Sequence, residues 1–246
     1  MTTNFTAYKM LALGLTLGAS LVLSACSDSD NASRDNATNI EFEISVTNLS
    51  AAQPLSPAAI LLHSNQWHSF STGQPASLEL EYLSEGGDNA QLLSTSLSDN
   101  LVYSAESGMG IIAPGESETF QVHTSENNLG TLSLSVLSML VNSNDAIAAL
   151  NNKALSSLEL NESMSFELIT YDTGTEANSE SSDTIPGPAA EGGAREGFNA
   201  ERDDLRDAVY VHPGVVTQND GLSTSTLEEI HRWDNPAMKV QVQRIR

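Results

Sequence analysis

The sequence has one cysteine, few aromatic residues and few positive charges, and each shortage limits what the protein can be. Cys26 is the only cysteine among 246 residues, so no disulfide can form within the chain. Aromatic residues make up 5% of the chain, so a packed core must rest mainly on Leu, Val, Ile and Ala. Lys and Arg number 10 against 32 Asp and Glu, a net charge of −22. Such a surface repels phosphate backbones, which argues against nucleic acid as a partner, and it suits a protein that binds cations or stays soluble in salt.

The first 25 residues have the pattern of a lipoprotein signal peptide. Lys9 precedes an apolar run over residues 10–23, which is short for a membrane-spanning helix. The run ends in the tetrapeptide LSAC at residues 23–26, which resembles the bacterial lipobox with its lipidated cysteine. The pattern predicts cleavage after residue 25, acyl chains on Cys26 that anchor the protein to a membrane, and a flexible polar tether over residues 26–38. A free thiol after an ordinary signal peptide is the alternative.

The residue after the cysteine bears on the location of the protein. Ser27, rather than Asp, follows Cys26, which favours export to the outer membrane of a Gram-negative bacterium, whereas Asp28 weakens that inference. We therefore expect an outer-membrane lipoprotein of the cell envelope.

From residue 39 onward, short segments predict an all-β fold. Ile40, Phe42, Ile44 and Val46 alternate with polar residues, as in a half-buried strand. Ser77 is expected to cap a helix that ends at a Gly-Gly pair, with a weaker helix over residues 89–97. Further strands are expected at residues 58–63, 101–104, 110–113, 118–123, 131–140, 163–170, 208–212 and 238–242. About eight short strands separated by turns favour one antiparallel β-sandwich over residues 39–246, with short helices and one long acidic loop.

That loop spans residues 171–207 and has almost no apolar pattern. At its start Asp172 and Glu176 flank Gly174, which permits a sharp bend. Oxygen ligands on a loop with a glycine at the turn suit a hard cation such as calcium. For these residues alone, a solvated acidic loop is the alternative. Glu180, farther along, is expected to be solvated.

Several blocks of residues, taken in order, resemble the spondin N-terminal domain, the module of F-spondin and mindin that also occurs in bacterial secreted proteins. The matching blocks are WHSF leading to Gly73 (67–73), AS to EG (76–86), SML followed by SND (138–145) and YDTGTE (171–176), while LST (222–224) and HRWDNP (231–236) are similar to bacterial members. The resemblance implies a β-sandwich related to calcium-dependent membrane-binding domains, with one calcium ion held by loops at one end.

By position, the resemblance assigns Asp145, Asp172 and Glu176 as the calcium ligands. Glu176 stands where animal members commonly have Asp, which keeps the charge and lengthens the side chain by one methylene. Cysteines of the animal members are missing here. Neighbouring strands are expected to bring Asp145 and Asp172 to one end of the sandwich.

The expected function is adhesion or ligand binding, with an extracellular polysaccharide or a surface protein as partner. One alternative is a structural envelope lipoprotein whose calcium site only stabilises the fold. We do not expect an enzyme, because the sequence has no G-x-S-x-G, no H-E-x-x-H and no phosphate-binding glycine loop. A glycan hydrolase with two catalytic carboxylates is the remaining, weaker alternative.

Two histidines and two tryptophans complete the candidates. His63 and His68 flank Trp67 and could join a transition-metal site, although packing histidines are the more ordinary interpretation. Trp67 and Trp233 could stack on a ligand, or fill the margins of the core with the indole N–H hydrogen-bonded.

Overall fold

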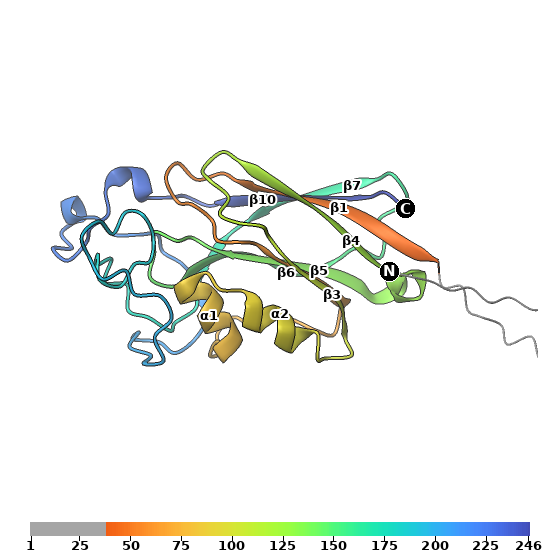
Figure 1. Cartoon of the computed structure of the whole chain (residues 1–246), viewed down its shortest axis with the longest axis horizontal. Coiled ribbons are helices and arrows are strands. Elements are labelled where there is room, and N and C mark those ends of the chain that lie inside the picture. The colour runs from red at the N-terminus through yellow and green to blue at the C-terminus, as the bar shows by residue number, and fades with distance from the viewer. Residues whose placement is uncertain (1–37) are drawn as a thin grey trace, which may run out of the picture. The chain divides into compact units, whose positions relative to one another are not determined.

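Two antiparallel β-sheets face each other in the computed structural model, which describes residues 38–246 (Figure 1). One sheet has the strand order β4-β1-β10-β7 and the other has the order β3-β2-β5-β6-β8-β9. The all-β sandwich expected from the sequence is therefore confirmed. The expected signal peptide, Cys26 and the tether up to residue 37 lie outside the described residues.

The ten strands of the described chain are β1 (Asn39–Asn48), β2 (Ala59–Ser64), β3 (Val102–Ser107), β4 (Ser117–Ser125), β5 (Leu132–Met139), β6 (Ala146–Ala154), β7 (Ser163–Leu168), β8 (Thr170–Asp172), β9 (Tyr210–Val211) and β10 (Met238–Arg244). The helices are α1 (Leu78–Gly86) and α2 (Ala90–Ser96), with 3-10 turns η1 (Glu126–Thr131), η2 (Gln218–Asp220) and η3 (Glu229–His231). No helix within residues 38–246 has the length and apolar character needed to cross a membrane.

The core lies between the sheets and is built by alternation along the strands. Ile40, Phe42, Ile44 and Val46 of β1 all point inward and are almost completely buried, as their spacing predicted. Strand β5 is different, because every one of its residues is buried. Helix α1 lies against the sheet that contains β5 (Figure 1). Its Leu80 and Leu83 belong to a second, smaller apolar cluster on the outer face of that sheet.

The helix predicted after Ser77 forms as expected. The Ser77 hydroxyl accepts a hydrogen bond from Leu80 N, which satisfies one of the free N–H groups of the first turn. Gly87 ends the helix in the left-handed conformation with a φ of 68°, a geometry that glycine adopts without strain.

Three sequence predictions about strands need correction. The single strand expected at residues 163–170 is in fact the end-to-end pair β7 and β8, which belong to different sheets. Residues 110–113 do not form a strand, because only Ile112 makes an isolated bridge, with Leu55. Strand β6 was not predicted, since its first half is rich in alanine and its second half contains Asn-Asn-Lys, so no alternation marks it. Pairing with β5 and β8 on either side holds β6 in place despite that weak local signal.

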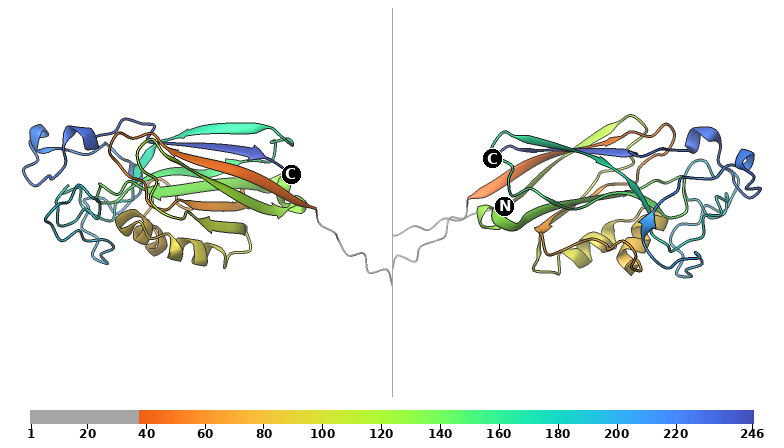
Figure 2. Two further views of the ribbon diagram at one scale, coloured as in Figure 1. Left: turned by 45° about the horizontal axis from the view of Figure 1, so that its top comes forward. Right: turned by 180° about the vertical axis from the view of Figure 1, so that it is seen from behind.

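The long connections gather at one end of the sandwich, which we call the loop end. Strand β1 runs from Asn39 at the opposite end to Asn48 at the loop end, a distance of roughly 30 Å at the rise of a β-strand. The segments that follow β8 and β9 fold over the loop end, away from the start of β1 and from the C-terminus (Figure 2).

Candidate cation site at the loop end

Asp145 and Asp172 lie at adjacent strand ends. Asp145 immediately precedes β6, Asp172 is the last residue of β8, and the two strands pair antiparallel with Ala146 opposite Asp172. Both acidic side chains are completely buried. The register confirms the expectation that neighbouring strands bring the two acids to one end of the sandwich.

The turn after Asp172 wraps around the Asp145 carboxylate. Asp145 Oδ2 accepts hydrogen bonds from Thr175 N at 2.8 Å, Glu176 N at 3.3 Å, and the hydroxyls of Thr173 at 3.0 Å and Thr175 at 3.2 Å. Asp145 Oδ1 has no hydrogen-bond partner among the described residues. One oxygen therefore anchors the turn, while the other is buried without a donor, which is unfavourable unless a ligand completes it.

Asp172 has a different environment, because both of its oxygens are engaged. Asp172 Oδ1 accepts from Gly174 N at 2.9 Å, and Asp172 Oδ2 accepts from Asn178 Nδ2 at 2.6 Å. Gly174 has a φ of 72°, and a Cβ atom there would lie only 2.5 Å from Ala208 O, so this bend requires glycine. Asp172 thus shapes the start of the loop.

Three more carboxylates are buried around these two. Glu176 follows the turn, Glu180 lies farther along the loop and Glu85 is in the last turn of α1, and none of the three is more than 9% exposed. We call the set the carboxylate cluster; it comprises Glu85, Asp145, Asp172, Glu176 and Glu180. Within the described part of the chain, no Lys or Arg forms an ion pair with any of its members.

Four members of the cluster carry a buried oxygen without a hydrogen-bond partner. These atoms are Glu85 Oε1, Asp145 Oδ1, Glu176 Oε2 and Glu180 Oε2, and the amide oxygen of Asn178 is in the same position. The second oxygen of Glu85 accepts from Asn199 N at 2.8 Å, and that of Glu180 accepts from Val216 N at 3.2 Å. The unpartnered atoms are all acceptors, so a cation or added protons would satisfy them.

The expectation that Glu180 is solvated is wrong, since the residue is only 1% exposed. Its N–H donates to Asn144 Oδ1 at 3.0 Å, and its carbonyl accepts from Thr226 N at 2.8 Å. The backbone adopts a positive φ of 52°, which is unusual for a residue with a side chain. The long loop therefore turns back into the protein at this residue. Nothing in the local sequence marks this return, nor the burial of Glu85.

Burial raises the pKa of the cluster carboxylates. It raises the pKa of Asp145 to about 7, with the nearby charge of Asp172 adding to the effect. Burial also raises the pKa of Glu176 to about 9, of Glu180 to about 8 and of Glu85 to about 7. Neighbouring acids contribute in each case, so the cluster resists carrying its full negative charge unless a positive charge lies among its members.

The unpartnered oxygens suit a hard cation better than a transition metal as ligand atoms. The unpartnered acceptors are carboxylate and amide oxygens, which calcium prefers. Over residues 38–246, no three His, Cys, Asp or Glu side chains are already arranged to hold a metal ion. The carboxylate side chains would therefore have to turn toward a cation as it binds, and the charge of the cation would offset the repulsion between them.

His63, Trp67 and Trp233 pack into the protein, whereas His68 is exposed. His63 is fully buried, with Nδ1 2.8 Å from Ser64 O and Nε2 2.8 Å from Ser135 Oγ. His68 instead bonds to Asn152 through Nδ1, so the two histidines make separate contacts. Trp233 fills the core margin and donates from Nε1 to Thr170 Oγ1 at 2.9 Å, as the packing interpretation predicted.

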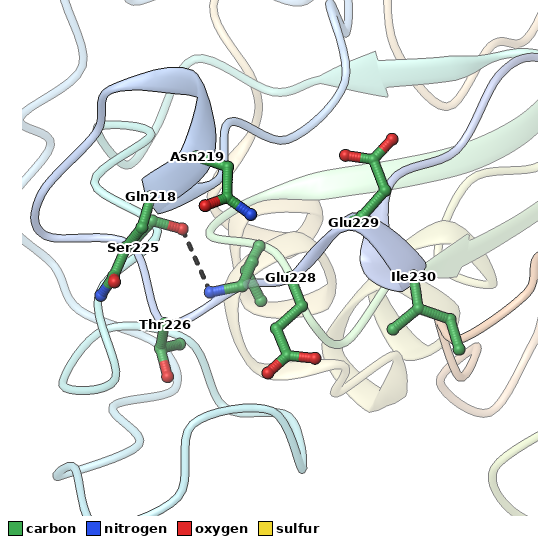
Figure 3. A pocket seen from close by; sticks show the side chains of 8 residues that line it. Gln218, Asn219, Ser225, Thr226, Glu228, Glu229 and Ile230 are labelled. Atoms are coloured by element: carbon green, nitrogen blue, oxygen red, sulfur yellow. Dashed lines mark hydrogen bonds between the residues drawn. The ribbon is translucent and has the colours of Figure 1, made fainter.

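Residues in and beside η2 and η3 line a polar hollow of about 650 Å³. Its lining includes Gln218, Asn219, Thr226, Glu228 and Ile230 (Figure 3). No member of the carboxylate cluster lines it. Hydrogen-bonding side chains and one exposed aliphatic residue line the hollow, and these do not specify a ligand.

The chain was also compared with known proteins. Neither a scan against protein-family models nor a search of curated proteins found a match. The resemblance to the spondin N-terminal domain therefore stays a prediction from the sequence, and the function must be argued from the loop end itself.

Proposed function

We propose that this protein is a calcium-binding, lipid-anchored module of the cell envelope that serves in adhesion or ligand binding. Asp145, Asp172 and Glu176 would hold the ion, which would supply the positive charge that the cluster lacks. The observation that carries the proposal is the set of buried carboxylate oxygens without partners around Asp145. Leaving such atoms unsatisfied costs free energy, and a dication with oxygen ligands would recover it.

The site lies at one end of the sandwich, away from the start of β1. The chain that leads from Cys26 joins the sandwich at Asn39, at the end opposite the carboxylate cluster. The ligands themselves are buried, so the ion would act by holding the loops in place. The outer surface of those loops would then make the contact with a polysaccharide or a surface protein.

Calcium-dependent stability tests the ion site. We expect calcium added to chelator-treated protein to raise the melting temperature, because the ion binds only the folded loop end. Asp145→Asn should abolish that rise, whereas Glu196→Gln, which removes an exposed acid from the same loop, should keep it. An unchanged melting temperature in calcium would refute the proposal.

Buried ligands also favour the structural alternative, in which calcium only stabilises the fold. Binding of the purified domain to whole cells or to polysaccharide, with and without chelator, separates the two functions. Chelator-sensitive binding supports adhesion. Calcium stabilisation without any binding supports the structural lipoprotein.

A further inference from the structure

We propose that Glu180 and Glu85 are also ligands of the cation, so that one ion ties helix α1 and the long loop to the β5–β6 turn. The inference rests on the proposed calcium site and adds two ligands to it. It is carried by two side chains that are almost fully buried and that each keep one oxygen without a partner.

The β5–β6 turn is the point where these segments meet. Asp145 Oδ2 accepts from the N–H of Glu176 at 3.3 Å, and the adjacent Asn144 Oδ1 accepts from the N–H of Glu180 at 3.0 Å. Two neighbouring residues of the turn therefore fix the backbone at both loop glutamates.

Helix α1 reaches the same place through its last turn. Ser84 Oγ lies 2.8 Å from Thr173 Oγ1, within hydrogen-bond distance, so the end of the helix lies against the turn that wraps Asp145. The next residue, Glu85, is only 1% exposed. Its Oε2 accepts from Asn199 N, which leaves Oε1 free to bind the ion.

The coordination number of calcium is consistent with extra ligands. Calcium takes about 6–8 oxygens, and fully buried sites supply most of them from the protein. Of the three carboxylates predicted from the sequence, Asp172 already accepts a hydrogen bond on each oxygen. Glu85 Oε1 and Glu180 Oε2 match the free oxygens of Asp145 and Glu176 in burial and in lacking a donor.

The consequence is that the ion would fasten the long loop near both of its ends. Glu176 and Glu180 lie near its start, while Asn199, held by Glu85, lies toward its end. Arg202 adds a second attachment to α1 through its ion pair with Glu81. The amides near residue 199 should therefore exchange with solvent more slowly when the ion is bound, although they are far in sequence from the ligands of the loop.

Terbium binding to the chelator-treated domain is the direct test, because the luminescence lifetime of bound Tb³⁺ counts its water ligands. In Glu180→Gln and in Glu85→Gln we expect affinity for Tb³⁺ and Ca²⁺ to fall about tenfold or more. The one oxygen of glutamine would accept from Asn199 N or Val216 N, as the second carboxylate oxygen does now, and its NH₂ group would face the ion. Because that group cannot be a ligand, we also expect about one additional bound water in each variant. Glu196→Gln, the matched control, should change neither value.

Glutamine has the shape of the protonated acid, so both variants are expected to keep the fold, which circular dichroism checks. Should Glu180→Gln fail to fold, the water count in Glu85→Gln decides the inference. Wild-type affinity and water count in these variants, together with loss of binding in Asp145→Asn, would overturn the two added ligands and leave the calcium site standing. Absence of any Ca²⁺ or Tb³⁺ binding by the wild type would overturn the proposed function itself.

Discussion

The interior between the two sheets and the carboxylate cluster at the loop end are equally buried but differ in chemistry. Phe42, Leu134 and Val240 line the interior and leave no polar group to satisfy, so their burial stabilises the sandwich by itself, at about 25 cal/mol per Å² of apolar surface. The cluster buries carboxylates whose oxygens lack partners and whose pKa values are raised. The sheets therefore need nothing beyond their own side chains, whereas the loop end buries acceptor oxygens that no described residue satisfies.

The largest expected effect on stability comes from a substitution in the apolar interior between the sheets. Phe42→Ala should lower the free energy of unfolding by about 3–5 kcal/mol, because it removes a fully buried ring from between the sheets. Urea unfolding should give the same loss in calcium and in chelator. A loss that depends on calcium would show that the two regions are coupled and contradict their separation.

Calcium should act on the loop end alone. At a free concentration about 100 times Kd it should add about 2.7 kcal/mol to the free energy of unfolding. Phe42→Ala should keep this gain and Asp145→Asn should lose it, as urea titrations of each variant would show. If Asp145→Asn keeps the gain, the ion binds elsewhere.

The bend that shapes the cluster can be tested at its glycine. Gly174→Ala should destabilise the domain by about 1–3 kcal/mol, because alanine is strained at a φ of 72° and its Cβ would meet the backbone of Ala208. The variant should also bind calcium more weakly, since the turn carries Thr175 and Glu176. Calorimetric titration gives the affinity, and Gly192→Ala, where the φ is also positive but the added Cβ meets nothing, controls for strain alone.

The smallest effect concerns His63, outside the cluster. Burial lowers the pKa of His63 and the nearby His68 charge adds to this, so the folded protein favours the neutral ring. The unfolded chain binds the extra proton, so the contribution of His63 to stability is present above about pH 6.5 and falls as the pH drops below it. The slope of stability against pH below 6.5 should be steeper in wild type than in His63→Gln, by at most about 1.4 kcal/mol per pH unit. Equal slopes in the two proteins would mean that the buried ring accepts a proton without loss.

Much of the fold was predictable because its signals are local. The alternation from Ile40 to Val46 specifies one buried face, and Ser77 with Gly87 marks both ends of a helix by backbone chemistry alone. Within the site, the acids and the glycine of the turn at 172–176 are also a local signal. A bend with a positive φ favours glycine, so the residue type itself indicates the bend.

Tertiary structure decided the rest. Strand β6 is held by its partners on both sides, against a weak pattern of its own. Glu85 and Glu180 look like ordinary surface acids, and their burial depends on segments far away in the chain. The Glu85 side chain bonds to a backbone N–H 114 residues later, and the Glu180 N–H bonds to a side chain 36 residues earlier.

The sequence by itself therefore determined an acidic chain with a β-sandwich and an acidic turn, because periodicity and turn chemistry act over a few residues. Only the tertiary structure decided which acids lose contact with water, because burial is set by what packs on a residue from elsewhere. That selection buried Glu85 and Glu180 as well as Asp145 and Glu176, with an unpartnered oxygen on each.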